Sequence, residues 1–426
     1  MRSPLRLWVL AALLPLTLSA QPKPVGTGSY KFIRYQANTL HFDTLSPSLL
    51  HFFNKWAFMV ANGNGNINIV HIGGSHVQAG SLTNTVRTNL LAAYPHLVAS
   101  RGMIFPYSAA ARCNNPPDYR VRCQQKMILT RNVHKDPAYP LGLCGIAVTA
   151  ADVHTEIDIL MNEPRVSYAT DHVVLIGHSS HGTIPRLRIN GRELYPSYID
   201  NYTDRYIFNL TAPADSFSIV LPCRPGEQFT VSGIYLGNHR PGISYHSIGV
   251  NGASVPDYLR CPHFVRDLRM LQPDLVIFGI GINDAVPQNF DTAAFRRNYL
   301  QLVDSVRRIN PDCAFIFITN NDSYRKASRR HYHVNSNGQL AREAFYRIAR
   351  DCGGAVWDQF EVMGGLRSMD TWRQAGLAQT DRVHFTTAGY QLVGNLFTNA
   401  LLNALSRYAK PAAATPTTSS RTPLLP

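Results

Sequence analysis

Ser75 lies in the stretch VHIGGSHVQAG, residues 70–80, directly after an apolar run and the glycines Gly73 and Gly74. The apolar run predicts a buried strand, and the two glycines predict a tight turn at its end. A serine on a sharp turn between a strand and a helix presents its hydroxyl for nucleophilic attack. A glycine-rich turn or a helix N-cap would explain the same residues. Ser75 is therefore a candidate nucleophile that needs support from the rest of the chain.

Backbone and amide donors are predicted at the ends of two later strands. Gly249 and Gly252 lie in YHSIGVNGAS, where a glycine lets a backbone N–H approach a substrate oxygen closely. Asn283 lies in GIGINDA, at the end of an apolar run of the kind that is buried in parallel sheets. Because open α/β sheets bind ligands at this edge, the Asn283 amide could donate to an oxyanion. An ordinary turn and an Asx turn are the alternatives.

Asp381 and His384 lie three residues apart in DRVHFTTAGY, just before the last predicted helix. An aspartate that orients a histidine, and a histidine that accepts a serine proton, are the parts of a catalytic triad. A chance Asp-x-x-His pair and a metal site are the alternatives. A second serine motif, GHSSHG at residues 177–182, resembles the Gly-x-Ser-x-Gly elbow of other hydrolases. Its fifth position is His181 and no helix follows, so we interpret it as strand and turn.

The elements that must position these residues fall into two kinds. The runs DLVIFGIG and CAFIFITN predict buried strands, and strands alternate with helices from about residue 246 to 409. This alternation predicts an α/β fold with a mainly parallel sheet. Residues 108–245 instead predict short strands between turns, including an Asn190-Gly191 hairpin, which is typical of a β-sandwich. We therefore expect an inserted β domain at 108–245, between α/β parts at 21–107 and 246–409.

The ends of the chain and its charge suggest the cellular context. Residues 1–20 have a basic start, an apolar centre and small residues at the end, which predicts a signal peptide. Residues 410–426 are rich in proline, threonine and serine and predict a disordered tail. The net charge of +14 falls to +12 without Arg2 and Arg6. Anionic polysaccharide is a suitable partner, whereas dispersed charges and the lack of a stacking motif argue against nucleic acid.

Seven cysteines are scattered along the chain. Cys113 and Cys123 are the closest candidates for a disulfide, and the odd count leaves at least one cysteine without an intramolecular partner. Cys313 and Cys352 fit best as small buried apolar residues. No Cys/His spacing suggests zinc, so we expect neither a metal nor another cofactor.

Taken in order, GGSH, GVNGAS, GIND and DRVH resemble the sequence blocks of the SGNH/GDSL hydrolase superfamily. The resemblance covers roughly residues 67–107 and 246–407. It implies a flavodoxin-like three-layer α/β/α domain with its site at the carboxyl ends of the strands.

Carried over to this chain, the resemblance implies a role for each candidate residue. Ser75 would be the nucleophile, and His384, held by Asp381, would be the general base. The backbone N–H groups of Ser75 and Gly252 and the Asn283 side chain would form the oxyanion hole.

The long β insert and GGSH in place of GDSL are most similar to bacterial peptidoglycan O-acetylesterases. In that group the insert resembles a carbohydrate-binding module, and the stretch GGLRSMDTWRQAGLAQTDRVHFTTAGY and His76 also agree with the group. Gly74 replaces the usual aspartate of the first block. This aspartate is outside the triad, so its loss removes a carboxylate that could brace the turn but leaves the mechanism intact.

We therefore expect an exported serine esterase, periplasmic or extracellular, that removes O-acetyl groups from a polysaccharide, with peptidoglycan as the leading substrate. A glycan O-acetyltransferase would use the same acetyl-serine and a sugar hydroxyl in place of water. A glycan-binding protein with a degenerate site is the alternative from a different class. The intact Ser, Gly, Asn, Asp and His set argues against it.

Overall fold

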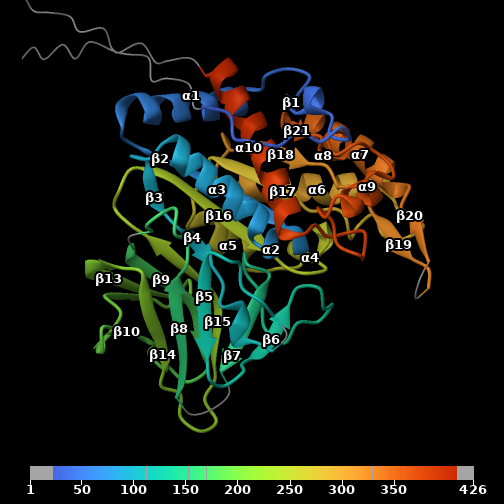
Figure 1. Ribbon diagram of the computed structural model, residues 1–426. Helices are drawn as coiled ribbons and strands as arrows, with labels where there is room; N and C mark the ends of the chain where they lie inside the picture. The colour runs from blue at the N-terminus through green and yellow to red at the C-terminus, as the bar shows by residue number, and fades with distance from the viewer. Residues whose placement is uncertain (1–22, 112, 151–153, 169, 329–330, 410–426) are drawn as a thin grey trace, which may run out of the picture.

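The computed structural model describes residues 23–111, 113–150, 154–168, 170–328 and 331–409. An α/β region and a β-rich region lie side by side (Figure 1). The predicted signal peptide at 1–20 and the predicted tail at 410–426 lie outside the described residues.

A mainly parallel sheet forms the centre of the α/β region. Its order is β1-β21-β18-β17-β2-β16-β3, and only β1 pairs antiparallel with its neighbour. In chain order the five inner strands run 2-1-3-4-5, which is the flavodoxin-like arrangement. The strands are β1 (Leu40–His41), β2 (Asn66–Gly73), β3 (Val98–Ser100), β16 (Gly242–Gly249), β17 (Leu275–Gly279), β18 (Ala314–Ile318) and β21 (Ala355–Trp357). The predicted parallel sheet is confirmed.

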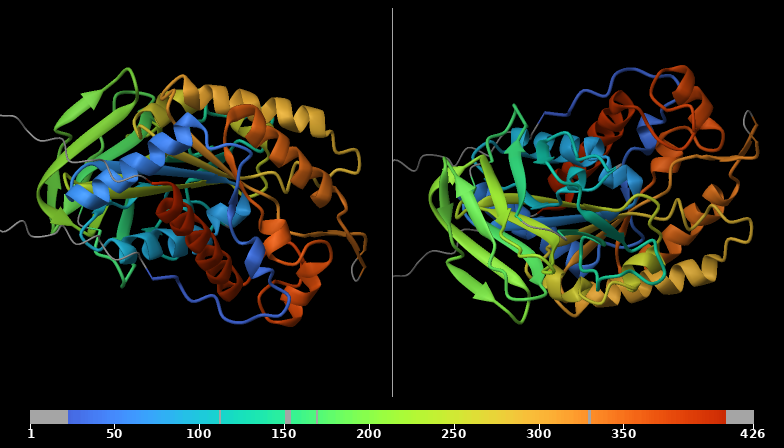
Figure 2. Two further views of the ribbon diagram at one scale, coloured as in Figure 1. Left: turned by 90° about the horizontal axis from the view of Figure 1, so that it is seen from above. Right: turned by 90° about the horizontal axis from the view of Figure 1, so that it is seen from below.

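Helices cover both faces of this sheet (Figure 2). One hydrophobic cluster joins α4, α5, α6 and α7 to one face, and a second joins α1, α3, α9 and α10 to the other. The α/β/α layers are therefore confirmed. The helices are α1 (Pro47–Asn62), α2 (Ser75–Gln78), α3 (Ser81–Ala93), α4 (Val255–Leu259), α5 (Phe264–Arg269), α6 (Thr292–Arg307), α7 (Asn337–Cys352), α8 (Gln359–Val362), α9 (Ser368–Gln374) and α10 (Thr387–Tyr408). Short 3-10 turns at Tyr35–Ala37 and Tyr107–Ala109 and the hairpin of β19 (Tyr324–Lys326) and β20 (Tyr332–Val334) complete the region.

Two antiparallel sheets form the β-rich region, as predicted. One has the order β11-β10-β14-β8-β5; the other has the order β12-β13-β9-β15-β7-β6, with β4 paired to β15. Asn190 and Gly191 both have positive φ, at 50° and 77°, and link β10 to β11 as the predicted hairpin turn. The GHSSHG motif is the end of β9 and the turn after it, as we interpreted it. The strands are β4 (Gly102–Ile104), β5 (Tyr119–Cys123), β6 (Ile128–Arg131), β7 (Ile146–Ala150), β8 (Thr155–Met161), β9 (Thr170–Ser179), β10 (Arg186–Ile189), β11 (Arg192–Leu194), β12 (Tyr198–Asp200), β13 (Arg205–Ala214), β14 (Ser216–Leu221) and β15 (Phe229–Gly237).

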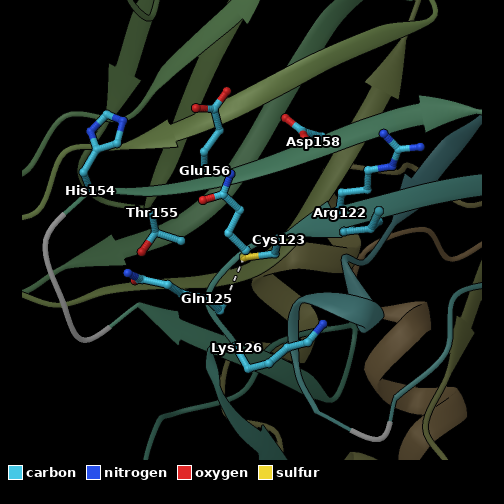
Figure 3. A pocket seen from close by; sticks show the side chains of 10 residues that line it. Arg122, Cys123, Gln125, Lys126, His154, Thr155, Glu156 and Asp158 are labelled. Atoms are coloured by element: carbon cyan, nitrogen blue, oxygen red, sulfur yellow. Dashed lines mark hydrogen bonds between the residues drawn. The ribbon is translucent and has the colours of Figure 1, made fainter.

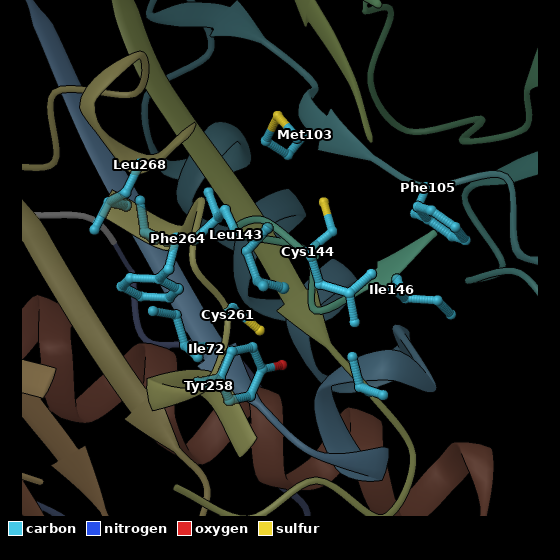
Figure 4. Close-up of a cluster of buried hydrophobic side chains, with 14 of the residues drawn as sticks. Ile72, Met103, Phe105, Leu143, Cys144, Ile146, Tyr258, Cys261, Phe264 and Leu268 are labelled. Carbon is cyan, nitrogen blue, oxygen red and sulfur yellow. The ribbon is translucent and has the colours of Figure 1, made fainter. Parts of the chain in front are cut away.

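The two regions share one hydrophobic core (Figure 4). Met103 and Ile146 of the β-rich region belong to the same buried cluster as Ile72 of β2 and Tyr258 and Phe264 of the helices α4 and α5. Because both regions bury apolar side chains in this cluster, the stability of each region depends on the other. We propose that the predicted divisions near residues 107 and 245 separate two structural regions that fold together.

Two predictions need correction. The disulfide between Cys113 and Cys123 is wrong, because all seven cysteines are unpaired. Cys123 donates to the Gln125 carbonyl oxygen at 2.9 Å, whereas Cys113 accepts from the Gln78 side chain at 3.5 Å, so the two thiols face different neighbours. The stretch SHVQAGSLTNTVRTNLLAAYP predicts one helix after Ser75, but the structure has two, because Gly80 has a φ of +76° and separates α2 from α3.

Candidate active site

Ser75 is the first residue of α2 and follows directly on the sharp turn that ends β2. The turn brings the helix back over the strand. A Cβ atom on Gly73 would lie 2.3 Å from Val77 Cγ2 and 2.8 Å from the Gly279 carbonyl oxygen, so only glycine fits at this position. Close packing against Val77 and Gly279 therefore explains why residue 73 is a glycine. The predicted strand-to-helix turn is present.

A line of hydrogen bonds joins Ser75 to His384, which lies 309 positions later in the chain, and continues to Asp381. Ser75 Oγ lies 2.7 Å from His384 Nε2, and His384 Nδ1 lies 2.7 Å from Asp381 Oδ2. The other Asp381 oxygen accepts from the backbone N–H groups of Val383 and His384 at 2.9 and 3.0 Å. Burial alone would raise the pKa of Asp381, but the hydrogen bonds from the His384 side chain and from the two backbone groups lower it to about 2. Asp381 is therefore an anion that fixes the orientation of the imidazole.

Gly252 and Asn283 face the same pocket of about 620 Å³ as Ser75 and His384. Gly252 has a φ of +84°, a conformation that favours glycine, and only one atom, Val133 Cγ1 at 3.8 Å, would meet a Cβ there. Asn283 Nδ2 donates one hydrogen to the Ala253 carbonyl oxygen at 2.9 Å, which leaves its second N–H for a ligand. The sequence-predicted residues therefore come together around a single pocket.

The departure at Gly74 has a local explanation. A Cβ atom at this position would lie 3.5 Å from both Asn283 Nδ2 and the Ala253 carbonyl oxygen. A side chain at residue 74 would therefore point toward the Asn283 amide. In this chain the Ala253 carbonyl takes the hydrogen bond that orients Asn283, so the amide is held without a carboxylate at position 74.

Gln78 is a contributor to the pocket that the motifs did not reveal. Its Oε1 accepts from the Asn251 backbone N–H at 2.6 Å, and its side chain is 5 % exposed. Gln78 thus ties α2, which carries Ser75, to the loop that carries Gly252. The spacing of three residues from Ser75 places both on one helical turn, and this spacing is the only sequence signal for the contact.

Asp284, next to Asn283, supports the same loop from the other side. Its two oxygens accept from the Val255 backbone N–H at 3.2 Å, at the start of α4. Burial raises the pKa of Asp284 to about 7. Asp284 therefore titrates close to neutral pH although it is a carboxyl group.

Amide side chains dominate the polar lining of the pocket, and its described lining contains no lysine, arginine, aspartate or glutamate. The amides are Gln78, Asn114, Asn115, Asn251, Asn283 and Gln379. Asn114 and Asn115 come from the segment that leads into β5 of the β-rich region, so both regions contribute to the pocket. Amides donate and accept hydrogen bonds without a net charge, which suits a neutral polar ligand.

A second groove of similar size, about 680 Å³, lies on the β-rich region (Figure 3). It has charged side chains of both signs, including Arg122, Lys126, Glu156 and Asp158, and its described lining contains no serine–histidine pair.

Comparisons with known proteins give one family match and several structural matches. The model of the GDSL-like lipase/acylhydrolase family matches residues 230–392, which include Gly252, Asn283, Asp381 and His384 but not Ser75. A solved peptidoglycan O-acetylesterase superposes with a TM-score of 0.71 at 19 % sequence identity, over 85 % of this chain and 98 % of that chain. The family match over residues 230–392 and the shared fold together support a carboxylic ester hydrolase of the SGNH/GDSL type.

Other solved structures superpose on this chain with lower TM-scores. A lipase/acylhydrolase from Enterococcus faecalis has a TM-score of 0.29 at 22 % identity, over 41 % of this chain and 80 % of that chain. A family two carbohydrate esterase from Clostridium thermocellum, in complex with cellohexaose, has a TM-score of 0.31 at 12 % identity, over 66 % and 99 % of the two chains. A search of curated protein sequences finds no significant match. Among the helices of the described residues, none has the length and apolar character needed to cross a membrane.

Proposed function

We propose that this SGNH esterase removes O-acetyl groups from a polysaccharide, with peptidoglycan as the leading substrate. The observation that carries the proposal is the unbroken line of two 2.7 Å hydrogen bonds from Ser75 through His384 to Asp381. Such a line activates a serine, because the histidine accepts the proton while the aspartate holds the correct ring tautomer.

In the proposed reaction, Ser75 Oγ attacks the acetyl carbonyl carbon and His384 Nε2 takes the serine proton. The carbonyl oxygen becomes an oxyanion, which accepts from the backbone N–H groups of Ser75 and Gly252 and from the free N–H of Asn283. When the bond between the acetyl carbon and the sugar oxygen breaks, His384 returns the proton to the sugar oxygen. The products of this half-reaction are a sugar hydroxyl and acetyl-Ser75.

Water completes the cycle at the same site. It attacks acetyl-Ser75 while His384 takes one of its protons, and the oxyanion hole again receives the negative charge. Collapse of this intermediate releases acetate and returns the proton to Ser75 Oγ. The enzyme is restored without any added co-reactant except water.

The chemistry of the pocket supports a carbohydrate substrate. Its amide side chains can pair with sugar hydroxyl and acetamido groups, whereas a long acyl chain would require an apolar channel. The superposed protein is itself a peptidoglycan O-acetylesterase, which supports peptidoglycan in particular. We further propose that the predicted signal peptide at residues 1–20 exports the protein to the periplasm or beyond, where such a polymer is found.

The test compares the mature protein with its Ser75→Ala variant on a chromogenic acetyl ester, on a longer-chain ester and on O-acetylated peptidoglycan. We expect acetate release from the short ester and the polymer, and a loss on the order of 10⁴-fold or more in the variant. Activity retained by Ser75→Ala would contradict the proposal. Transfer of acetyl groups to an added glycan without release of acetate would instead identify a transferase.

A further inference from the structure

A small cavity lies beside the Ser75 turn, where His76 and Val77 line it, and Ile282 lines both this cavity and the substrate pocket. It has a volume of about 30 Å³ and its polar lining includes His71, His76 and Asn320. His71 Nε2, His76 Nε2 and Asn320 Nδ2 are shielded from solvent, and none has a hydrogen-bond partner within the described residues. A buried donor or acceptor without a partner is costly, so three of them around one cavity require an explanation.

The opposite nitrogen of each histidine is bonded to a tyrosine. His76 Nδ1 lies 2.9 Å from Tyr390 Oη, and His71 Nδ1 lies 2.8 Å from Tyr245 Oη. Burial lowers the pKa of both histidines to about 3, so both rings are neutral at physiological pH. Each ring therefore has one N–H group and one nitrogen that can only accept.

The cavity is large enough for water and has the right number of polar partners. A single water needs roughly 10–15 Å³ of such space and two to four partners. We propose that this cavity binds an ordered water molecule that bridges His71, His76 and Asn320, and that His76, fixed in this way, is a positioning residue for His384. A water oxygen accepts only two hydrogen bonds. Because Asn320 donates one, at least one of the two histidines must offer an unprotonated Nε2.

His76 links this hydration site to the triad, because its ring packs against the His384 ring. Its ring lies 5.2 Å from the His384 ring, centroid to centroid, with 43° between the planes, and Phe385 and Tyr390 pack against its other sides. His384 has its own hydrogen bonds to Ser75 and Asp381, so His76 supports the ring by contact rather than by a hydrogen bond. The water bridge thus fixes the orientation of the His76 ring against which His384 packs. This part of the proposal depends on the proposed role of His384 as general base.

The first test is a high-resolution crystal structure of the full-length mature enzyme and of its Asn320→Leu variant. We expect a water within hydrogen-bond distance of all three atoms in the wild type, and its loss or displacement in the variant. A metal ion in the cavity, or a dry cavity in the wild type, would overturn the hydration site. This outcome is independent of activity, so it holds even if Ser75→Ala disproves the esterase mechanism.

The second test is a double-mutant cycle on the acetyl ester. We expect Asn320→Leu to lower kcat about fivefold with KM within twofold, because misplacement of the base affects chemistry more than binding. His76→Phe keeps a ring against His384 but removes both nitrogens, and we expect a loss of about tenfold. If His76 transmits the effect, Asn320→Leu has no further effect in the His76→Phe background.

Multiplied effects of the two substitutions, or an unchanged kcat in Asn320→Leu, would overturn the positioning role. Ile318→Val is the matched control, since Ile318 lines the same cavity but offers no hydrogen bond. We expect its kcat to stay within twofold of the wild type. If Asn320→Leu does not fold, His71→Phe replaces it in the double-mutant cycle with His76→Phe.

Discussion

The pocket at Ser75 and the groove on the β-rich region have similar volumes but differ in how their polar side chains interact. In the pocket between the regions, Ser75, His384 and Asp381 form one directed line of hydrogen bonds, and the amides around them are uncharged. In the groove of the β-rich region, cationic and anionic side chains lie together, and Glu156 forms an ion pair at 2.6 Å with Arg188, which lies beyond the lining of the groove. Converging groups with unequal roles identify a reactive site better than the size of the opening does.

The Ser75–His384–Asp381 line should lose its catalytic effect when residue 381 can no longer accept the hydrogen bond from His384 Nδ1 as a carboxylate does. We expect Asp381→Asn to lower kcat by about 10³- to 10⁴-fold, because the amide stabilises the wrong tautomer of His384. Steady-state rates on the acetyl ester measure this effect, with circular dichroism as the check on folding. A loss of less than tenfold would show that His384 does not depend on Asp381.

Removal of one oxyanion donor should cost less than breaking the triad. We expect Asn283→Ala to lower kcat by about 100- to 1000-fold, because the amide stabilises charge that appears only in the transition state. Asn283→Asp is the matched control, since it keeps the size of the side chain but has no N–H. Near-wild-type turnover in Asn283→Ala would remove Asn283 from the mechanism.

The pocket side should also show a pH signature in the stability of the protein. Asp284 has a pKa of about 7, raised by burial from an ordinary value of 3.8. Between these values the folded protein keeps a proton that the unfolded chain releases, so the free energy of unfolding decreases as pH rises through this window. Asp284→Asn cannot titrate and should show a smaller fall in Tm from pH 5 to pH 8.

Differential scanning fluorimetry at the two pH values measures this change. Asp291→Asn is the control, because Asp291 is exposed at the start of α6 and asparagine preserves its capping of Ala293 and Ala294. A Tm difference that is the same in Asp284→Asn as in the wild type would contradict the assignment.

The groove of the β-rich region should contribute least to chemistry on a small ester. We expect the double variant Arg122→Ala, Lys126→Ala to keep kcat/KM for the acetyl ester within about twofold, because surface charges away from the reacting atoms act weakly through water. Rates on O-acetylated peptidoglycan, measured in parallel, show whether the groove matters for a polymer. A large loss on the small ester would place the groove in contact with the catalytic site.

Much of this architecture could be predicted from local pattern. The apolar runs before Ser75 and Asn283 predicted parallel strands, and strand ends in such a sheet meet at one edge, so the candidate residues were expected together. The β-rich region followed from short strands and the turn at Asn190 and Gly191, whose positive φ values are a strictly local property. The roles of the site residues stay predictions until the variants above are measured.

What the sequence did not reveal depends on contacts between distant segments. Gln78 holds the Gly252 loop through a backbone N–H that no side-chain motif reports. His76 and Tyr390 meet only because α2 and α10 pack together, 314 positions apart in the chain. The pairing of Cys113 with Cys123 failed for the same reason, since nearness in sequence does not decide which way two thiols face.

The separation of 309 positions between Ser75 and His384 has a consequence for the synthesis of the protein on the ribosome. A ribosome that adds about 5–20 residues per second needs roughly 15–60 seconds to travel from the proposed nucleophile to its proposed base. In the proposed mechanism, the nascent chain has the serine during that interval but lacks the histidine that would activate it. A product that terminates before Asp381 would also lack this histidine, and we expect it to hydrolyse esters poorly.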